Sequence, residues 1–64
     1  MAIYVTQNEN GSWDVYIAGR EIAETNNLPY TAAMSRARDL IHRNGGGDII
    51  ITDSKGHTSY EHVD

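Results

Sequence analysis

Cysteine and phenylalanine are absent from this 64-residue chain, and proline occurs once. Without cysteine the fold contains no disulfide bond, and zinc sites built from four thiolates are excluded. A chain of this length forms one domain, residues 1–64, which buries only about 60% of the surface that its unfolded chain exposes. The small core therefore has to suffice by itself or gain buried area by self-association.

Long apolar runs are also missing. The N-terminal sequence MAIYVTQNEN has no basic leader and no apolar stretch of signal-peptide length. No later segment approaches the roughly 18 apolar residues of a membrane span. We therefore expect a soluble, cytoplasmic protein that does not insert into membranes.

Basic residues are scarce, with five Lys and Arg against nine Asp and Glu, and the net charge is −4. This charge disfavours sequence-independent attraction to nucleic acid. Three arginines and one aspartate leave residues 31–44 at +2, so the rest of the chain sums to −6. The sequence thus predicts one basic element on an acidic body.

Two segments near the N-terminus have the period of two that is typical of half-buried strands. The first contains Ile3 and Val5, and the second contains Trp13, Val15 and Ile17. In each segment these apolar side chains share one face, and the residues between them share the other. The pattern predicts an antiparallel hairpin with one buried face.

The loop between these strands decides their register. A two-residue loop at Asn10-Gly11 would put the aliphatic side chains of the two strands on opposite faces, which wastes the core. A three-residue loop, Glu9–Gly11, has glycine at the left-handed position that its bulge requires. The resulting register pairs Ile3 with Ile17, Val5 with Val15 and Gln7 with Trp13, and makes Tyr4 and Tyr16 neighbours on the other face.

After the second strand, Gly19-Arg20 fits a two-residue turn with glycine at its first central position. This turn predicts a short third strand at Glu21–Glu24, with Ile22 opposite Ile17. From Pro29 the apolar period changes to that of an amphipathic helix. The apolar helical positions are Ala33, Met34, Ala37, Leu40 and Ile41.

The ends of this helix also have recognisable signals. Thr31 is the predicted N-cap, Arg43 suits the last turn, and Asn44–Gly47 ends the helix with residues that tolerate positive φ. The helix alanines permit close approach to a sheet, so the strands have to supply the large apolar volume. Trp13 is the expected filler.

Two further strands are expected, DIIITD and, after a glycine turn, HTSYEHV. The order is then β-β-β-α-β-β, a small two-layer α+β domain with an antiparallel sheet and one amphipathic helix packed on one face. The pattern leaves open whether the last hairpin joins the first sheet.

Three stretches together, NGSWDVYIAG, TAAMSRARDLI and GGGDIIITDSKGH, resemble a family of small uncharacterised bacterial and phage proteins, a domain of unknown function. The shared features are a Gly-x-Trp-x-Val hairpin, a Thr-started Ala-rich helix and a Gly-flanked aliphatic strand. The matching positions are Gly11, Trp13, Val15, Thr31, Ala33, Ala37, Leu40, Gly46, Ile49, Ile51 and Gly56. The resemblance implies the fold over nearly the whole chain and carries no agreed activity.

Tyr4 and Tyr16 are the strongest candidates for a binding surface, because a helix covers only one side of the sheet. Aromatic side chains on a sheet can stack on bases, but Asp14 and Glu21 are expected on the same face and would repel phosphates. A tyrosine pair rimmed by carboxylates fits a protein contact better. The alternative is an ordinary cross-strand pair in solvent.

Other motifs argue against catalysis and against metal or phosphate binding. The three histidines have no ligand spacing on one surface, and the serines lack a histidine and an acid at any recognisable spacing. The run Gly45–Gly47 follows a helix, whereas phosphate-binding loops precede one. We expect neither an enzyme nor a bound metal or cofactor.

These observations predict a non-enzymatic interaction module whose partner is another protein or protein complex. In the most concrete form it is an acidic, phage-encoded, anti-CRISPR-like inhibitor of a host nucleic-acid-binding defence complex. The alternatives are a structural homodimer, and a nucleic-acid binder that uses the helix arginines Arg36, Arg38 and Arg43. The predicted contact residues are Tyr4, Asp14, Tyr16, Glu21, Glu24, Asp48 and Asp53.

Overall fold

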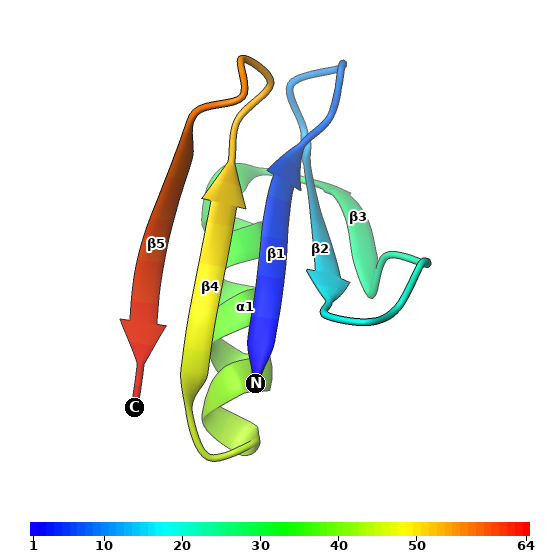
Figure 1. The fold of residues 1–64 in the computed structure, drawn as a ribbon. Helices are drawn as coiled ribbons and strands as arrows, with labels where there is room; N and C mark the ends of the chain where they lie inside the picture. The colour runs from blue at the N-terminus through cyan, green and yellow to red at the C-terminus, as the bar shows by residue number, and fades with distance from the viewer.

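The computed structural model describes residues 1–64 as one five-stranded sheet with a single helix on one face (Figure 1). The elements are β1 (Ala2–Gln7), β2 (Trp13–Ile17), β3 (Thr25–Leu28), α1 (Tyr30–Arg43), β4 (Gly47–Thr52) and β5 (Thr58–Val63). The predicted α+β class and element order are confirmed, and the last hairpin joins the same sheet. The helix α1 is too short and too polar to cross a membrane.

The strand order across the sheet is β3-β2-β1-β4-β5, so the N-terminal strand is central. The register between β1 and β2 is the predicted one, with Val5 opposite Val15 and Tyr4 opposite Tyr16. Gly11 has φ +84° in the connecting loop, as that loop requires. β1 and β4 form the one parallel pair, because the chain returns to the sheet through α1.

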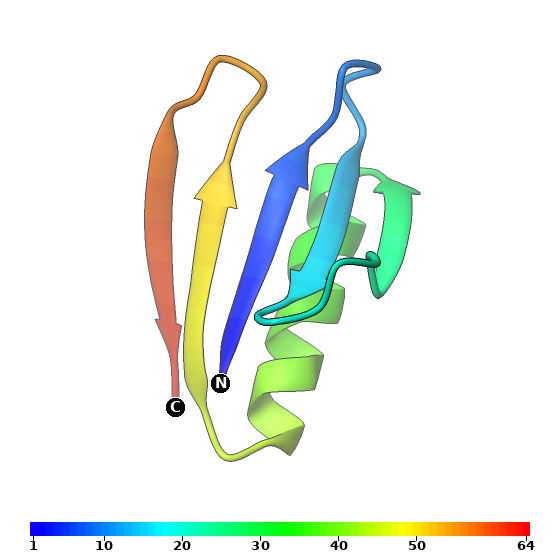
Figure 2. The same ribbon diagram turned by 45° about the vertical axis from the view of Figure 1, so that its right-hand side comes forward.

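The core lies between one face of the sheet and α1, which passes behind β2 in Figure 2. Its nine buried residues are Ile3, Val5, Val15, Ala33, Met34, Ala37, Ile41, Ile49 and Ile51. Small alanines on the helix let it approach the strands, and the aliphatic side chains fill the space. Trp13 faces the helix side as predicted, but it is half-buried and packs against the margin of this core.

The predicted third strand at Glu21–Glu24 is wrong, because β3 begins at Thr25, one residue after the predicted strand ends. Residues 18–24 form a loop, and Ile22 in it is 84% exposed instead of lying opposite Ile17. The polar sequence TNNL pairs with β2 at two positions, Leu28 opposite Trp13 and Thr25 opposite Val15. The register shifts between these two pairs. Burial of Leu28 against the core outweighs the turn preference of Gly19-Arg20.

The helix begins at Tyr30, and Pro29 is its N-cap without a side-chain hydrogen bond, so the predicted Thr31 cap is wrong. Pro29 has the extended backbone that a residue flanking a helix needs. The C-terminus agrees with the prediction. The N–H of Gly46 donates to the Ile41 carbonyl and that of Gly45 to the His42 carbonyl, which is a Schellman motif.

Candidate functional site

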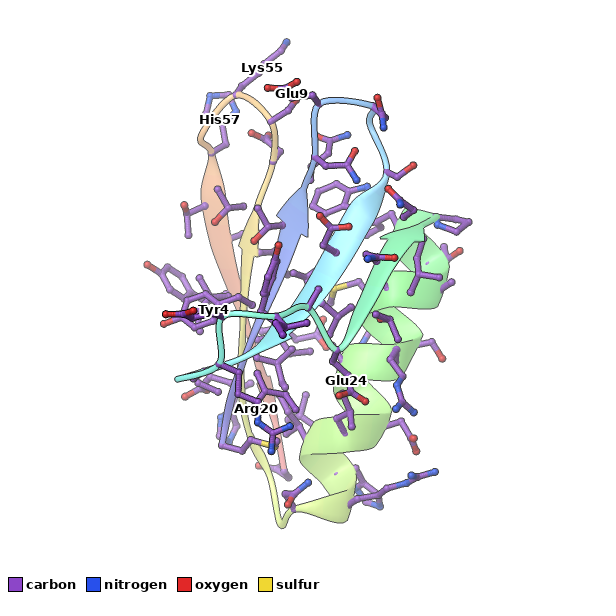
Figure 3. The ribbon with its side chains drawn as sticks, turned by 90° about the vertical axis from the view of Figure 1, so that its right-hand side faces the viewer. Tyr4, Glu9, Arg20, Glu24, Lys55 and His57 are labelled. Atoms are coloured by element: carbon purple, nitrogen blue, oxygen red, sulfur yellow. The ribbon has the colours of Figure 1, made fainter.

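The face of the sheet turned away from α1 is the candidate contact surface (Figure 3). Tyr4 points to that side, whereas Ile3 and Val5 on either side of it are fully buried beneath the helix. Successive residues of a strand alternate between faces, so the register assigns each strand residue to one face. We call this surface the open face and define it by Tyr4, Thr6, Asp14, Tyr16, Asp48, Ile50, Thr52, Thr58, Tyr60 and His62.

One row of the open face consists of four large side chains, one from each of four strands. The register pairs Tyr16 with Tyr4, Tyr4 with Ile50, and Ile50 with Tyr60. Neighbouring strands lie about 4.8 Å apart, so these side chains adjoin one another. Tyr4 is 43% exposed and Tyr60 76%, while Tyr16 and Ile50 are half-buried. We call these four residues the aromatic row.

Two members of the aromatic row, Ile50 and Tyr60, are missed by the sequence analysis. Ile50 lies within three consecutive isoleucines, where every residue is apolar and alternation gives no signal. Its face follows from the parallel pairing of β1 with β4, which joins residues far apart in the chain. Tyr60 then follows from Ile50 through the β4–β5 hairpin.

Asp14 lies on the open face, but its carboxylate holds the neighbouring strand in place. Its Oδ1 accepts a hydrogen bond from the Asn27 backbone N–H at 2.9 Å and from the Asn8 side-chain amide at 3.4 Å. Asn27 has φ +57°, and its Oδ1 accepts a second hydrogen bond from Asn8 at 3.0 Å. Asp14 therefore stabilises the irregular pairing of β3 with β2.

Asp48 and His62 form a cross-strand pair at the other margin of the open face. Asp48 Oδ1 lies 2.8 Å from His62 Nδ1, and Asp64 Oδ1 lies 3.1 Å from His62 Nε2. The hydrogen bond with Asp48 raises the pKa of His62 above its ordinary 6.5, and the charge of Asp64 acts in the same direction. The Asp48 carboxylate is thus tied to the imidazole of His62 at this margin.

Glu21 and Glu24, the predicted contact residues of the third strand, do not lie on a strand of the sheet. Glu21 lies in the loop between β2 and β3, so the alternation that predicted it beside Tyr4 does not apply. Glu24 is directed toward α1 (Figure 3), where it forms a 2.8 Å ion pair with Arg36.

Asp53 follows β4 and organises the turn before β5. Its Oδ1 accepts hydrogen bonds from the backbone N–H groups of His57 and Lys55, each at 2.9 Å. The bond from His57, followed by the bond from Lys55, lowers the pKa of Asp53 below its usual range. The seven predicted contact residues therefore do not form one acidic surface, and the open face unites Tyr4, Tyr16, Asp14 and Asp48.

The arginines of α1 are paired with carboxylates. Arg43 lies 3.1 Å from Asp39, and Arg36 has the ion pair described above. Arg38 donates two hydrogen bonds to Glu61, at 2.6 and 2.8 Å, and they hold the pKa of Glu61 below its usual range. These internal pairs leave little free positive charge for a phosphate backbone.

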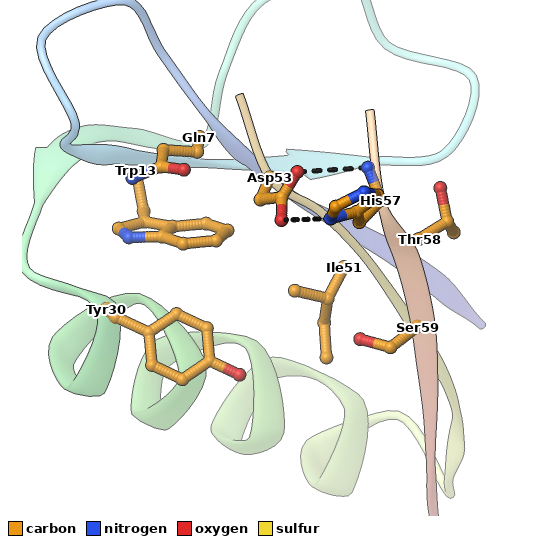
Figure 4. A pocket seen from close by; sticks show the side chains of 8 residues that line it. All are labelled: Gln7, Trp13, Tyr30, Ile51, Asp53, His57, Thr58 and Ser59. Carbon is orange, nitrogen blue, oxygen red and sulfur yellow. Dashed lines mark hydrogen bonds and ion pairs between the residues drawn. The ribbon is translucent and has the colours of Figure 1, made fainter. Parts of the chain in front are cut away.

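A hollow of about 430 Å³ lies beside the first turn of α1, on the helix side of the sheet (Figure 4). Trp13 and Tyr30 form its aromatic wall, edge to face with ring centroids 4.8 Å apart. Two of the polar side chains at its rim, Gln7 and Asp53, already serve the fold. Gln7 accepts a hydrogen bond from the Ser54 N–H and donates one to the Gly11 carbonyl, and Asp53 holds its turn. The hollow offers mainly apolar contact.

Comparison with family models, curated proteins and solved structures gives no match to this chain. The resemblance to a small bacterial and phage family stays a prediction. The open face and its aromatic row are the features of this chain that point to a function.

Proposed function

We propose that this protein is a non-enzymatic interaction module that binds another protein through the aromatic row. The observation that supports the proposal is a strip of four large side chains across the face that no helix covers. Tyrosine suits such contacts because it combines rigid apolar area with a polar tip. An ordinary cross-strand pair in solvent accounts for Tyr4 and Tyr16 but not for Ile50 and Tyr60 beside them.

The charges around the row favour a protein partner over a nucleic acid. Asp14 and Asp48 stand at its two margins, and the chain carries a net charge of −4. Such a surface repels phosphate and favours a neutral or basic protein surface. The absence of cysteine suits a cytoplasmic site of action, which is part of the proposal.

In its most concrete form, the partner is a basic, nucleic-acid-binding groove of a host defence complex. The protein would then be an acidic, phage-encoded inhibitor with an anti-CRISPR-like action. Its small size and its negative charge support this form. Addition of the purified protein should then release DNA or RNA from that complex, and a complex that retains its nucleic acid at saturating protein would contradict this form.

Two tyrosines provide a matched test of the proposal. Tyr4 and Tyr30 are each 43% exposed, but Tyr4 belongs to the aromatic row and Tyr30 lies on the helix side. In affinity capture from a host lysate, we expect Tyr4→Ser to lower partner recovery at least about tenfold, as for a central contact residue. Tyr30→Ser should retain recovery within about twofold.

The two variants have to be compared as folded proteins. Their circular dichroism spectra and melting curves give that control, because Tyr30→Ser also removes a ring contact with Trp13. Equal recovery of the same partner by both folded variants would show that the aromatic row is not the contact.

A further inference from the structure

The two edges of the sheet differ in their protection against pairing with another strand. β3, at one edge, has four residues, includes Asn27 in the left-handed region, and pairs with β2 out of regular register. β5, at the other edge, has six residues and pairs with β4 without a shift along its whole length (Figure 1). It contains no proline and no lysine. A long, regular edge of this kind is a template for another strand.

The one permanent charge within β5 does not protect this edge. Glu61 points to the helix side, where Arg38 holds both of its carboxylate oxygens. An unpaired inward charge opposes strand addition because another strand would bury it. Here the charge already has its partner, so strand addition leaves no isolated carboxylate.

The backbone groups that β5 offers to a further strand are those of Thr58, Tyr60 and His62. The N–H of Asp53 donates to the His57 carbonyl at 3.0 Å, at the start of the β4–β5 ladder. Residues of an antiparallel strand bond alternately to the two sides. The odd-numbered residues therefore bond to β4, and the even-numbered residues direct their N–H and C=O groups to the free edge.

We propose that two copies of this chain pair antiparallel through β5 about a two-fold axis, with Tyr60 opposite the same residue of the second copy. In this register Tyr60 exchanges both backbone hydrogen bonds with its counterpart, and Thr58 and His62 exchange theirs with each other.

Charge disfavours the neighbouring register that is centred on Glu61. That register sets Glu61 opposite Glu61 of the second copy, and like charges directly opposite one another are destabilising. The register centred on Tyr60 instead sets Glu61 opposite Ser59. Paired side chains also remain on matching faces, as the pleat demands.

The pairing closes after two copies. A two-fold contact uses the same surface on both chains, and the irregular β3 edge is left to end the joined sheet. The aromatic rows of the two copies meet at the axis and form one row across both sheets. This inference concerns the free edge and does not rest on the proposed function.

Analytical ultracentrifugation of the full chain provides the test. Because a six-residue strand is only about 20 Å long, the interface is small and the dimer should exchange with monomer. We expect the mass to rise from 7.1 kDa toward twice that value as concentration increases from about 10 μM to 1 mM. A mass that stays at 7.1 kDa over this range would overturn the proposal.

A pair of variants at Ser59 tests the register. Ser59→Glu sets a glutamate opposite Glu61 of the second copy, and by symmetry this happens twice in the dimer. We expect the repulsion to raise the dimer Kd about tenfold. Ser59→Lys sets opposite charges there and should leave the Kd unchanged or lower it. Ser59 is exposed in the single chain, so both variants should fold, which melting curves check. Equal Kd values for the two folded variants would contradict this register.

Amide hydrogen exchange gives an independent readout at the same positions. The amides of Tyr60 and His62 should exchange more slowly as concentration increases, while the amides of Ser59 and Glu61 are protected at every concentration. If Tyr4→Ser abolishes the dimer while Ser59→Glu leaves it intact, the two copies are joined through the open face. This result would overturn pairing through β5. Partner capture by the aromatic row is a separate measurement, so failure of either proposal can be recognised alone.

Discussion

Gly47, the first residue of β4, is the position where one methyl group should do the most damage. A Cβ built there overlaps the carbonyl oxygen of Met1 and comes within 3.0 Å of the Met1 nitrogen. At the same place the Asp48 N–H donates to the Met1 carbonyl at 3.0 Å, next to the first pair of the parallel β1–β4 ladder. The nearest obstructing atoms are all backbone atoms of Met1, so Gly47→Ala requires β4 and the start of the chain to separate locally.

The cost has two parts. Overpacking typically costs about 1–3 kcal/mol, and loss of the hydrogen bond beside it costs about 1 kcal/mol. We therefore expect Gly47→Ala to lower the free energy of unfolding by about 2–4 kcal/mol. A domain of this size is stable by roughly 3–10 kcal/mol. Since 1 kcal/mol corresponds to about 4–8 °C in a small domain, the Tm should decrease by roughly 10–25 °C.

Gly19→Ala is the matched control. Gly19 has φ +87°, and a Cβ there meets no atom within 4 Å, so only the backbone preference opposes alanine. That preference is worth about 1–2 kcal/mol. Thermal and urea unfolding followed by circular dichroism measure both variants. Equal losses of stability would contradict the close approach of β4 to Met1 and with it the parallel pairing that assigns Ile50 to the open face.

Three further predictions follow from single contacts. Asp14→Ala should lower the free energy of unfolding by about 1–2 kcal/mol in urea melts, because the Asn27 N–H loses its acceptor; an unchanged midpoint would show that this bond contributes nothing. Ile22→Ser should change stability by less than about 0.5 kcal/mol, because this side chain is 84% exposed, and a larger loss would indicate burial. The His62 imidazole should titrate above 6.5 by NMR, and Asp48→Asn should bring its pKa back toward that value. Because the folded pKa is the higher one, the stabilisation is complete below the unfolded pKa and is lost as pH rises through the folded pKa. A pKa that is the same in both proteins would refute the pairing.

The parts of the fold that the sequence predicts are those set by local rules. The glycine of the first loop and the alternation beside it determine the β1–β2 register, and with it the pairing of Tyr4 and Tyr16. The helix follows from its period and its Asn44–Gly47 end. Each signal acts within a few residues, so no knowledge of the rest of the chain is needed.

The third strand and the start of the helix depend on contacts between distant segments. The sequence TNNL has little strand preference of its own, and Asp14 and the packing of Leu28 against the core hold it on the sheet. Ile22, which suggested a strand, has no partner to bury it. Tertiary contacts thus outweigh a plausible local pattern at this edge.

The candidate site is predicted in part for the same reason. Tyr4 and Tyr16 follow from the hairpin, but Ile50 and Tyr60 join them only through the parallel strand pair. The prediction of the acidic contact residues is incomplete for a different reason. Glu24 has a partner on α1 that sequence spacing does not reveal, so its negative charge is not free on the open face.

Tyrosine modification within the captured complex, read by mass spectrometry, tests the central claim most directly. Tyr4 and Tyr30 have the same exposed fraction, 43%, so they should react at similar rates in the free protein and serve as an internal comparison. We expect the partner to lower the modification of Tyr4 about tenfold and to leave Tyr30 unchanged, as for a side chain at the centre of an interface. Undiminished modification of Tyr4 in the complex would contradict binding through the aromatic row.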